Sequence, residues 1–154
     1  MNYETQVMLE VSFEADEFYP QAAALGSHAA EALKDKHRSQ LTGLENIAES
    51  TSKISDIMDY IKKQTARFSH WGHTLARGEN AQQGFGERLR AYLENDLAQR
   101  RDIVCGRLQI GDSSYEDKQK RRRIYLLLVR QFIRSMVVEY EYAVSAGKNE
   151  RKEC

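Results

Sequence analysis

Proline is almost absent from the chain, which bears directly on its fold class. The 154 residues include a single proline, Pro20. Proteins built from strands and turns use proline at many turns and rarely manage with so little. A hydrophobic fraction of 41% and a charged fraction of 30% suit a slender helical bundle with much exposed surface. We therefore expect an all-α fold in a single domain, residues 1–154.

Net charge and long apolar runs are also missing. The 23 basic and 23 acidic residues cancel, so no overall field draws the chain towards nucleic acid or an anionic membrane. The longest strongly apolar run, residues 124–129, is far below the roughly 20 residues of a membrane span. The first residues lack the basic start and apolar core of a secretion signal. The only two cysteines, Cys105 and Cys154, fit a reducing compartment. We expect a soluble, cytoplasmic protein without a membrane span.

A regular spacing of apolar residues is the strongest pattern that the chain contains. Between residues 33 and 68, one residue recurs at every fourth or third position, and seven of these eleven are apolar. Such spacing predicts one long amphipathic helix of about 35 residues with a continuous apolar seam. At 1.5 Å per residue this helix would be about 50 Å long and could not bury its seam against itself. We expect an elongated bundle of about four helices.

Weaker sequence patterns predict where the other elements of the chain begin and end. Residues 3–13 alternate apolar and polar as in a half-buried strand, but a lone strand would leave its backbone unpaired, so helix is favoured and strand is the alternative. Pro20 suits the first position of a helix, and Gly26-Ser27 suits a kink or a new N-cap. Ser113 and Glu116 form a capping box that would open the last helix. The expected order is an N-terminal arm at 1–19, a kinked helical segment at 20–68, a loop at 69–85, a third helix at 86–106, a C-terminal helix at 113–147 and a tail at 148–154.

The C-terminal helix is apolar over most of its girth. An ordinary surface helix has a narrower apolar stripe, so we expect this one to be covered both by its own chain and by a neighbouring subunit. Arg130 and Arg134 lie within the apolar part of the helix. Buried guanidinium groups need carboxylates, and we expect Glu94 and Asp96 to supply them.

This excess of apolar surface indicates association through helices. We expect a non-catalytic assembly or adaptor subunit, either a homo-oligomer or a component of a larger complex, with no cofactor, no bound metal and no catalytic residues. The sequence does not identify the partner or the number of copies. The expected interface consists of apolar residues from the seam and from the C-terminal helix: Leu44, Ile47, Ile54, Met58, Ile61, Phe132, Met136 and Tyr140.

A cluster of basic residues supports an alternative function as a nucleic-acid-associated subunit. Counter-ion release makes such a cluster suitable for phosphate contacts, although no aromatic residues are interleaved with it for stacking on bases. The plainer interpretation is a solvated helix face balanced by Glu116 and Asp117. The stretch Thr51-Ser52-Lys53-Ile54 and the aromatic C-terminal helix resemble the small helical subunit of type III CRISPR effector complexes, which implies an association with RNA; we assign no family from this short stretch. The cluster comprises Lys118, Lys120, Arg121, Arg122 and Arg123.

A second alternative is an enzyme near the end of the seam. Arg67 and His73 have the Arg-x5-His spacing that resembles HEPN-type ribonucleases, in which such a pair acts on the RNA backbone. His70 and His73 could also share a metal if Cys105 or Glu79 supplied a third ligand. The plainer interpretation of this segment is that Trp71 closes the end of the bundle.

Overall fold

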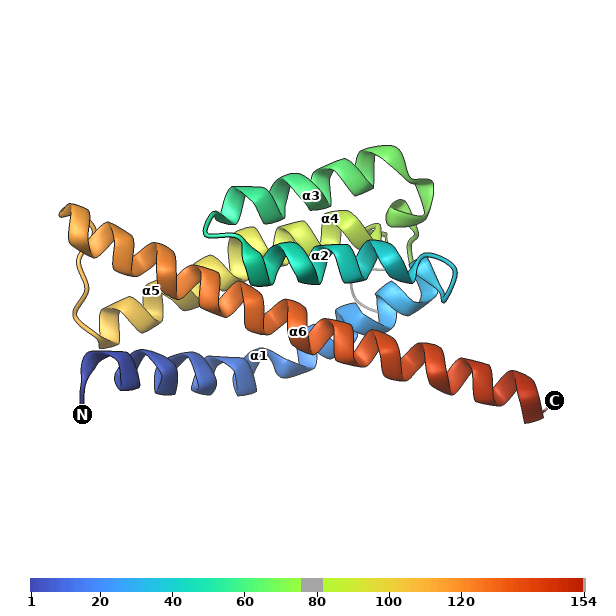
Figure 1. Ribbon diagram of the computed structural model, residues 1–154, viewed down its shortest axis with the longest axis horizontal. Coiled ribbons are helices and arrows are strands. Elements are labelled where there is room, and N and C mark those ends of the chain that lie inside the picture. The colour runs from blue at the N-terminus through green and yellow to red at the C-terminus, as the bar shows by residue number, and fades with distance from the viewer. Residues whose placement is uncertain (76–81, 154) are drawn as a thin grey trace.

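Two long helices determine the architecture of the computed structural model, which describes residues 1–75 and 82–153, with side chains up to residue 147. They are α1 (Tyr3–Leu33) and α6 (Tyr115–Glu153), and they cross at an angle while running in the same direction (Figure 1). Near their starts Arg123 pairs with Glu4 at 2.5 Å, and further along the Tyr140 hydroxyl donates to the carbonyl of Lys34. The fold is all-α, as predicted, and the described residues contain no strand.

Residues 3–13 belong to α1, so the favoured helical interpretation is confirmed. Asn2 caps the helix, since its side-chain oxygen accepts a hydrogen bond from the Thr5 amide at 2.8 Å. The prediction that Pro20 starts a helix is wrong, because Pro20 lies inside α1. A proline there removes one backbone hydrogen bond and bends the helix, and α1 changes direction in its middle in Figure 1. Gly26-Ser27 also lies inside α1, so this dipeptide does not begin a new helix.

The prediction of one helix of about 35 residues is wrong, because the segment forms two shorter helices. The segment forms α2 (Arg38–Ser50) and α3 (Ile54–Arg67), and residue 33 already belongs to α1. Lys34 has a φ of 52° and turns the chain from α1 into α2. At the second break, the Thr51 hydroxyl accepts a hydrogen bond from the Lys53 amide at 3.0 Å and donates to the Asp56 carboxylate at 2.5 Å.

Arg130 completes the break between α2 and α3. It donates one hydrogen bond to the Ala48 carbonyl at 2.7 Å and one to the Thr51 carbonyl at 2.8 Å, which satisfies backbone groups that the end of α2 leaves without helical partners. Arg134, one turn further along α6, makes two hydrogen bonds to Glu49 at 2.8 and 2.9 Å. The predicted pairing of both arginines with Glu94 and Asp96 is therefore wrong.

The predicted third helix is present with a local change of winding. It consists of α4 (Phe85–Ala91), the π-helical turn η2 (Tyr92–Asp96) and α5 (Leu97–Arg107). The segment predicted as a loop contains a short 3₁₀ helix, η1 (Ser69–Gly72). Trp71 is fully buried there, and its indole N–H donates to the side-chain oxygen of Gln40 at 2.8 Å.

The last helix starts close to the predicted position. The capping hydrogen bond comes one residue later than expected, since the Ser114 hydroxyl accepts from the Asp117 amide at 3.1 Å. The Asp117 carboxylate in turn accepts from the Gly111 amide at 3.1 Å, which stabilises the turn after α5. The helix continues to Glu153, so residues 148–153 of the predicted tail at 148–154 are helical.

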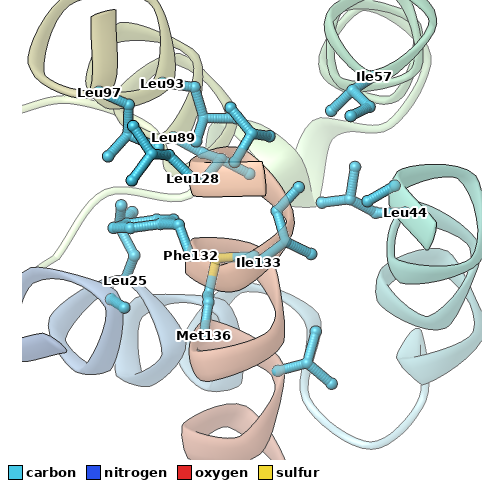
Figure 2. Close-up of a cluster of buried hydrophobic side chains, with 14 of the residues drawn as sticks. Leu25, Leu44, Ile57, Leu89, Leu93, Leu97, Leu128, Phe132, Ile133 and Met136 are labelled. Atoms are coloured by element: carbon cyan, nitrogen blue, oxygen red, sulfur yellow. The ribbon is translucent and has the colours of Figure 1, made fainter. Parts of the chain in front are cut away.

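A single core surrounds α6. Figure 2 shows Leu128, Phe132, Ile133 and Met136 of α6 pointing towards side chains from α1, α2, α3 and the α4–η2–α5 segment. The Phe132 ring packs edge-on against Phe18 of α1 at 5.4 Å and stacks on Tyr92 of η2 at 4.6 Å, measured between ring centroids. The broad apolar girth of α6 is thus explained by helices of its own chain.

The crossing of α1 and α6 depends on Gly26. A Cβ atom at this position would lie 2.5 Å from the Met136 carbonyl oxygen and 2.7 Å from the Cβ of Glu139. Atoms cannot approach so closely, so only glycine permits this spacing between the two helices.

Candidate functional site

The residues predicted to form an interface lie inside the protomer. Five of them, on α2, α3 and α6, are fully buried: Leu44, Ile61, Phe132, Met136 and Tyr140. Met58 is almost fully buried, and Ile47 and Ile54 pack against the same core. These side chains hold the protomer together, and of the eight only Ile47 and Ile54 are partly exposed.

A different apolar surface lies on the outer face of α1. Met8, Leu9, Phe13 and Tyr19 are 44–55% exposed, and we call them the α1 outer patch. Val7 and Val11 occupy the opposite face of the same helix and are buried.

The patch continues towards the end of α5. The Arg107 guanidinium lies 5.5 Å from the centre of the Phe13 ring and pairs with Glu10 at 3.1 Å. Leu9, Glu10 and Arg107 also line a hollow of about 410 Å³ between α1 and the end of α5. Ile103, one turn before Arg107 on α5, is another exposed apolar residue.

Three side chains of the predicted basic cluster pair with three different carboxylates. Arg123 pairs with Glu4 of α1, and Arg121 pairs with Asp102 of α5 at 2.5 Å. Lys120 pairs with Glu116 at 3.4 Å, and its ammonium group lies 5.0 Å from the centre of the Tyr3 ring. The cluster therefore does not form one continuous basic face.

Lys118 and Arg122 share a small hollow where α5 and α6 meet. The hollow measures about 230 Å³ and is lined by Arg101, Asp112, Lys118, Arg121, Arg122 and Tyr125. Arg101 contacts both the Asp102 carboxylate, at 3.0 Å, and the ring of Tyr125, at 5.0 Å from its centre. We call this feature the basic hollow.

The opposite end of the bundle gathers all four histidines of the chain. The rings of His37 and His70 stack with their centroids 3.8 Å apart, and His70 Nε2 lies 2.6 Å from the side-chain oxygen of Gln40. His28 is fully buried, and its Nε2 lies 2.8 Å from the carbonyl oxygen of His73.

The surroundings of His28 require a neutral ring. Its Nδ1 lies 3.1 Å from the guanidinium of Arg88, which can only donate, so Nδ1 accepts and the proton is on Nε2. Burial lowers the pKa of His28, and the charge of Arg88 lowers it further against the raising effect of the His73 carbonyl. Burial also lowers the pKa of His70, as do His37 and Lys36.

The residues of the predicted enzyme site make separate structural contacts. The Arg67 guanidinium lies over the Phe68 ring at 5.4 Å, whereas His73 Nε2 approaches Glu31 at 3.8 Å. Cys105 is buried in α5, and burial raises the pKa of its thiol. Glu79 lies outside the described residues, and the side chains of residues 1–75 and 82–147 include no group of three or more that could hold a metal ion.

The sequence did contain a signal for the α1 outer patch. A period of two places Val7, Leu9, Val11 and Phe13 on one face, as in a strand. A helical period instead separates Leu9 and Phe13, which are four residues apart, from Val7 and Val11. The helical period therefore places Leu9 and Phe13 on an exposed face, opposite the buried valines.

The described helices include none with the length and apolar character needed to cross a bilayer. Compared with protein-family models, curated proteins and solved structures, the chain has no match. The interpretation of its surfaces therefore depends on their geometry.

Proposed function

We propose that this protein is a non-catalytic assembly subunit that binds a protein partner through the α1 outer patch. The observation that carries the proposal is the exposure of Leu9 and Phe13, two large apolar side chains one helical turn apart, on a helix whose other face is already buried. Contiguous apolar residues on a polar surface are typical of protein interaction sites.

The shape of the patch suits a partner helix. Residues four apart on α1 form a ridge along the helix axis, and a second helix can pack its own side chains beside that ridge. Arg107 and Glu10 border the ridge and provide the polar rim that such interfaces have. A second copy of the chain and a different protein are both consistent with this surface.

The experiment compares two surfaces of the same protein. Light scattering is measured across a range of concentrations for the unchanged chain, for the double variant Leu9→Glu with Phe13→Glu, and for Tyr142→Glu. Tyr142 is a large exposed side chain on α6, away from the patch, and serves as the matched control. We expect the mass of the unchanged chain and of the control to rise with concentration, and the double variant to keep the mass of one chain.

A partner of different sequence would be found by photo-crosslinking in the cells that produce the protein. A crosslinking amino acid at position 13 should yield a defined adduct that position 142 does not yield. If the unchanged chain stays monomeric and position 13 yields no adduct beyond that of position 142, the proposal is wrong.

A cytoplasmic location is part of the same proposal. Cys105 has no disulfide partner among the described residues, and a buried free thiol suits a reducing compartment. The nucleic-acid alternative now depends on the basic hollow. Lys120 and Arg123 pair with carboxylates away from it, whereas Lys118, Arg121 and Arg122 line it.

A further inference from the structure

We propose that the basic hollow binds a phosphate group. The inference does not depend on the assembly proposal, because the hollow lies at the junction of α5 and α6 and shares no residue with the α1 outer patch. Four of its six lining residues are cationic, in a chain whose total charge is zero.

The local charges do not cancel. Arg101 and Arg121 share one carboxylate, that of Asp102. In the part of the chain that the structure describes, no ion pair engages Lys118 or Arg122, and Asp112 is the carboxylate in the wall of the hollow. The carboxylate of nearby Asp117 accepts a hydrogen bond from the Gly111 amide, which does not cancel its charge, so Asp102, Asp112 and Asp117 together offset three of the four cations. Positive charge is therefore left over in the hollow, and an anion would balance it.

One side of the hollow is held in position before any ligand arrives. The Tyr125 hydroxyl donates to the Leu93 carbonyl at 2.7 Å, which fixes the ring, and Arg101 lies against that ring while contacting Asp102. A guanidinium has five N–H donors, so Arg101 and Arg121 keep donors beyond those directed at Asp102. Oxyanions with several acceptor oxygens match such a set of donors, and phosphate is the common biological example.

The hollow has room for one or two phosphate groups at a time. A volume of about 230 Å³ accommodates a phosphate group but not a folded macromolecule. The phosphate can belong to a small phosphorylated molecule or to the backbone of a single strand of RNA that passes over the hollow. The chemistry of recognition is the same in both cases.

The test uses two probes and a pair of neighbouring arginines. Inorganic pyrophosphate and a single-stranded oligouridylate are titrated at low and at moderate salt into the full chain, into Arg122→Gln and into Arg123→Gln. Both variants lose one positive charge from adjacent positions of α6, but Arg122 lines the hollow whereas Arg123 faces Glu4. Circular dichroism melting verifies that both variants are folded.

We expect Arg122→Gln to weaken binding by about tenfold or more, and Lys118→Gln with Arg122→Gln to abolish it, while Arg123→Gln has little effect. For the RNA probe, Arg122→Gln should also reduce the slope of the salt dependence by about one. Tight pyrophosphate binding with weak RNA binding identifies a small phosphorylated ligand, and the reverse identifies a nucleic-acid strand. The proposal is overturned if neither probe binds at low salt, or if the two arginine variants lose the same affinity.

Discussion

His28 shows how one buried side chain can make the stability of the protein depend on pH. Its ring connects α1 to the segment after η1 through the His73 carbonyl, and it accepts a hydrogen bond from Arg88 of α4. A second proton on the ring would point an N–H at a guanidinium that is itself a donor. The folded protein therefore resists protonation of His28, as the lowered pKa indicates.

We predict that the free energy of unfolding falls as the pH is lowered below about 6.5, the ordinary pKa of histidine. In that range the unfolded chain binds a proton that the folded chain excludes, so acid favours unfolding until the pH reaches the lower pKa of the folded state. His28→Gln should flatten this dependence in thermal melts from neutral to mildly acidic pH. Part of the slope should remain, because the pKa of His70 is shifted in the same direction.

His73→Gln provides the control for this experiment. The backbone carbonyl of residue 73, and not its ring, binds His28, so the variant should retain most of the pH dependence. Equal slopes in the His28 and His73 variants would contradict the assignment.

Arg130 determines where α2 ends, although it belongs to another helix. Arg130→Met should lower the free energy of unfolding by about 1–3 kcal/mol, because two partly enclosed carbonyls at the end of α2 lose a charged donor. Arg134→Met removes an exposed ion pair with Glu49 from the next turn of α6 and should cost only about 0.2–1 kcal/mol. Urea unfolding distinguishes the two variants, and an equal loss in both would show that Arg130 acts only as a surface charge.

Local sequence patterns predict some of the helices but not all of the break that Arg130 completes. The helix predicted at 86–106 is present, and Leu89, Leu93 and Leu97, which recur every four residues in it, all lie on its buried side. The break at residues 51–53 has a local part, the hydrogen bonds of Thr51, and a distant part, which could not be predicted because it comes from a residue 79–82 positions further along the chain. Apolar spacing continues across the break, since α2 and α3 both face the same core.

The predicted interface illustrates a related limit. The spacing of Leu44, Ile61 and Phe132 correctly indicates that these side chains are buried. It does not indicate which chain buries them, because a core helix and an intersubunit helix have the same pattern. In this protein α6 lies between α1 on one side and the shorter helices on the other, and together they enclose most of its girth.

This arrangement predicts that the core stabilises a single protomer without contacts from a second chain. Phe132→Ala should lower the free energy of unfolding by about 3–5 kcal/mol through loss of contacts with Phe18 and Tyr92. Because these contacts lie within one chain, the loss measured by urea unfolding should be the same at low and high protein concentration. Phe13→Ala, on the exposed patch, should change the stability of the monomer by less than about 0.5 kcal/mol. A loss for Phe132→Ala that grows with concentration would indicate that a neighbouring chain completes the core.

The close approach at Gly26 has a consequence for parts of the protein that it does not touch. No residue is smaller than glycine, so any replacement at position 26 forces α1 and α6 further apart near Met136 and Glu139. α6 is one helix from its start to this crossing, so a small rotation about the crossing becomes a larger displacement towards the start of α6. The Glu4–Arg123 pair lies close to that start, where Lys118 and Arg122 are exposed. A residue without a side chain thus governs the alignment of surfaces several helical turns away.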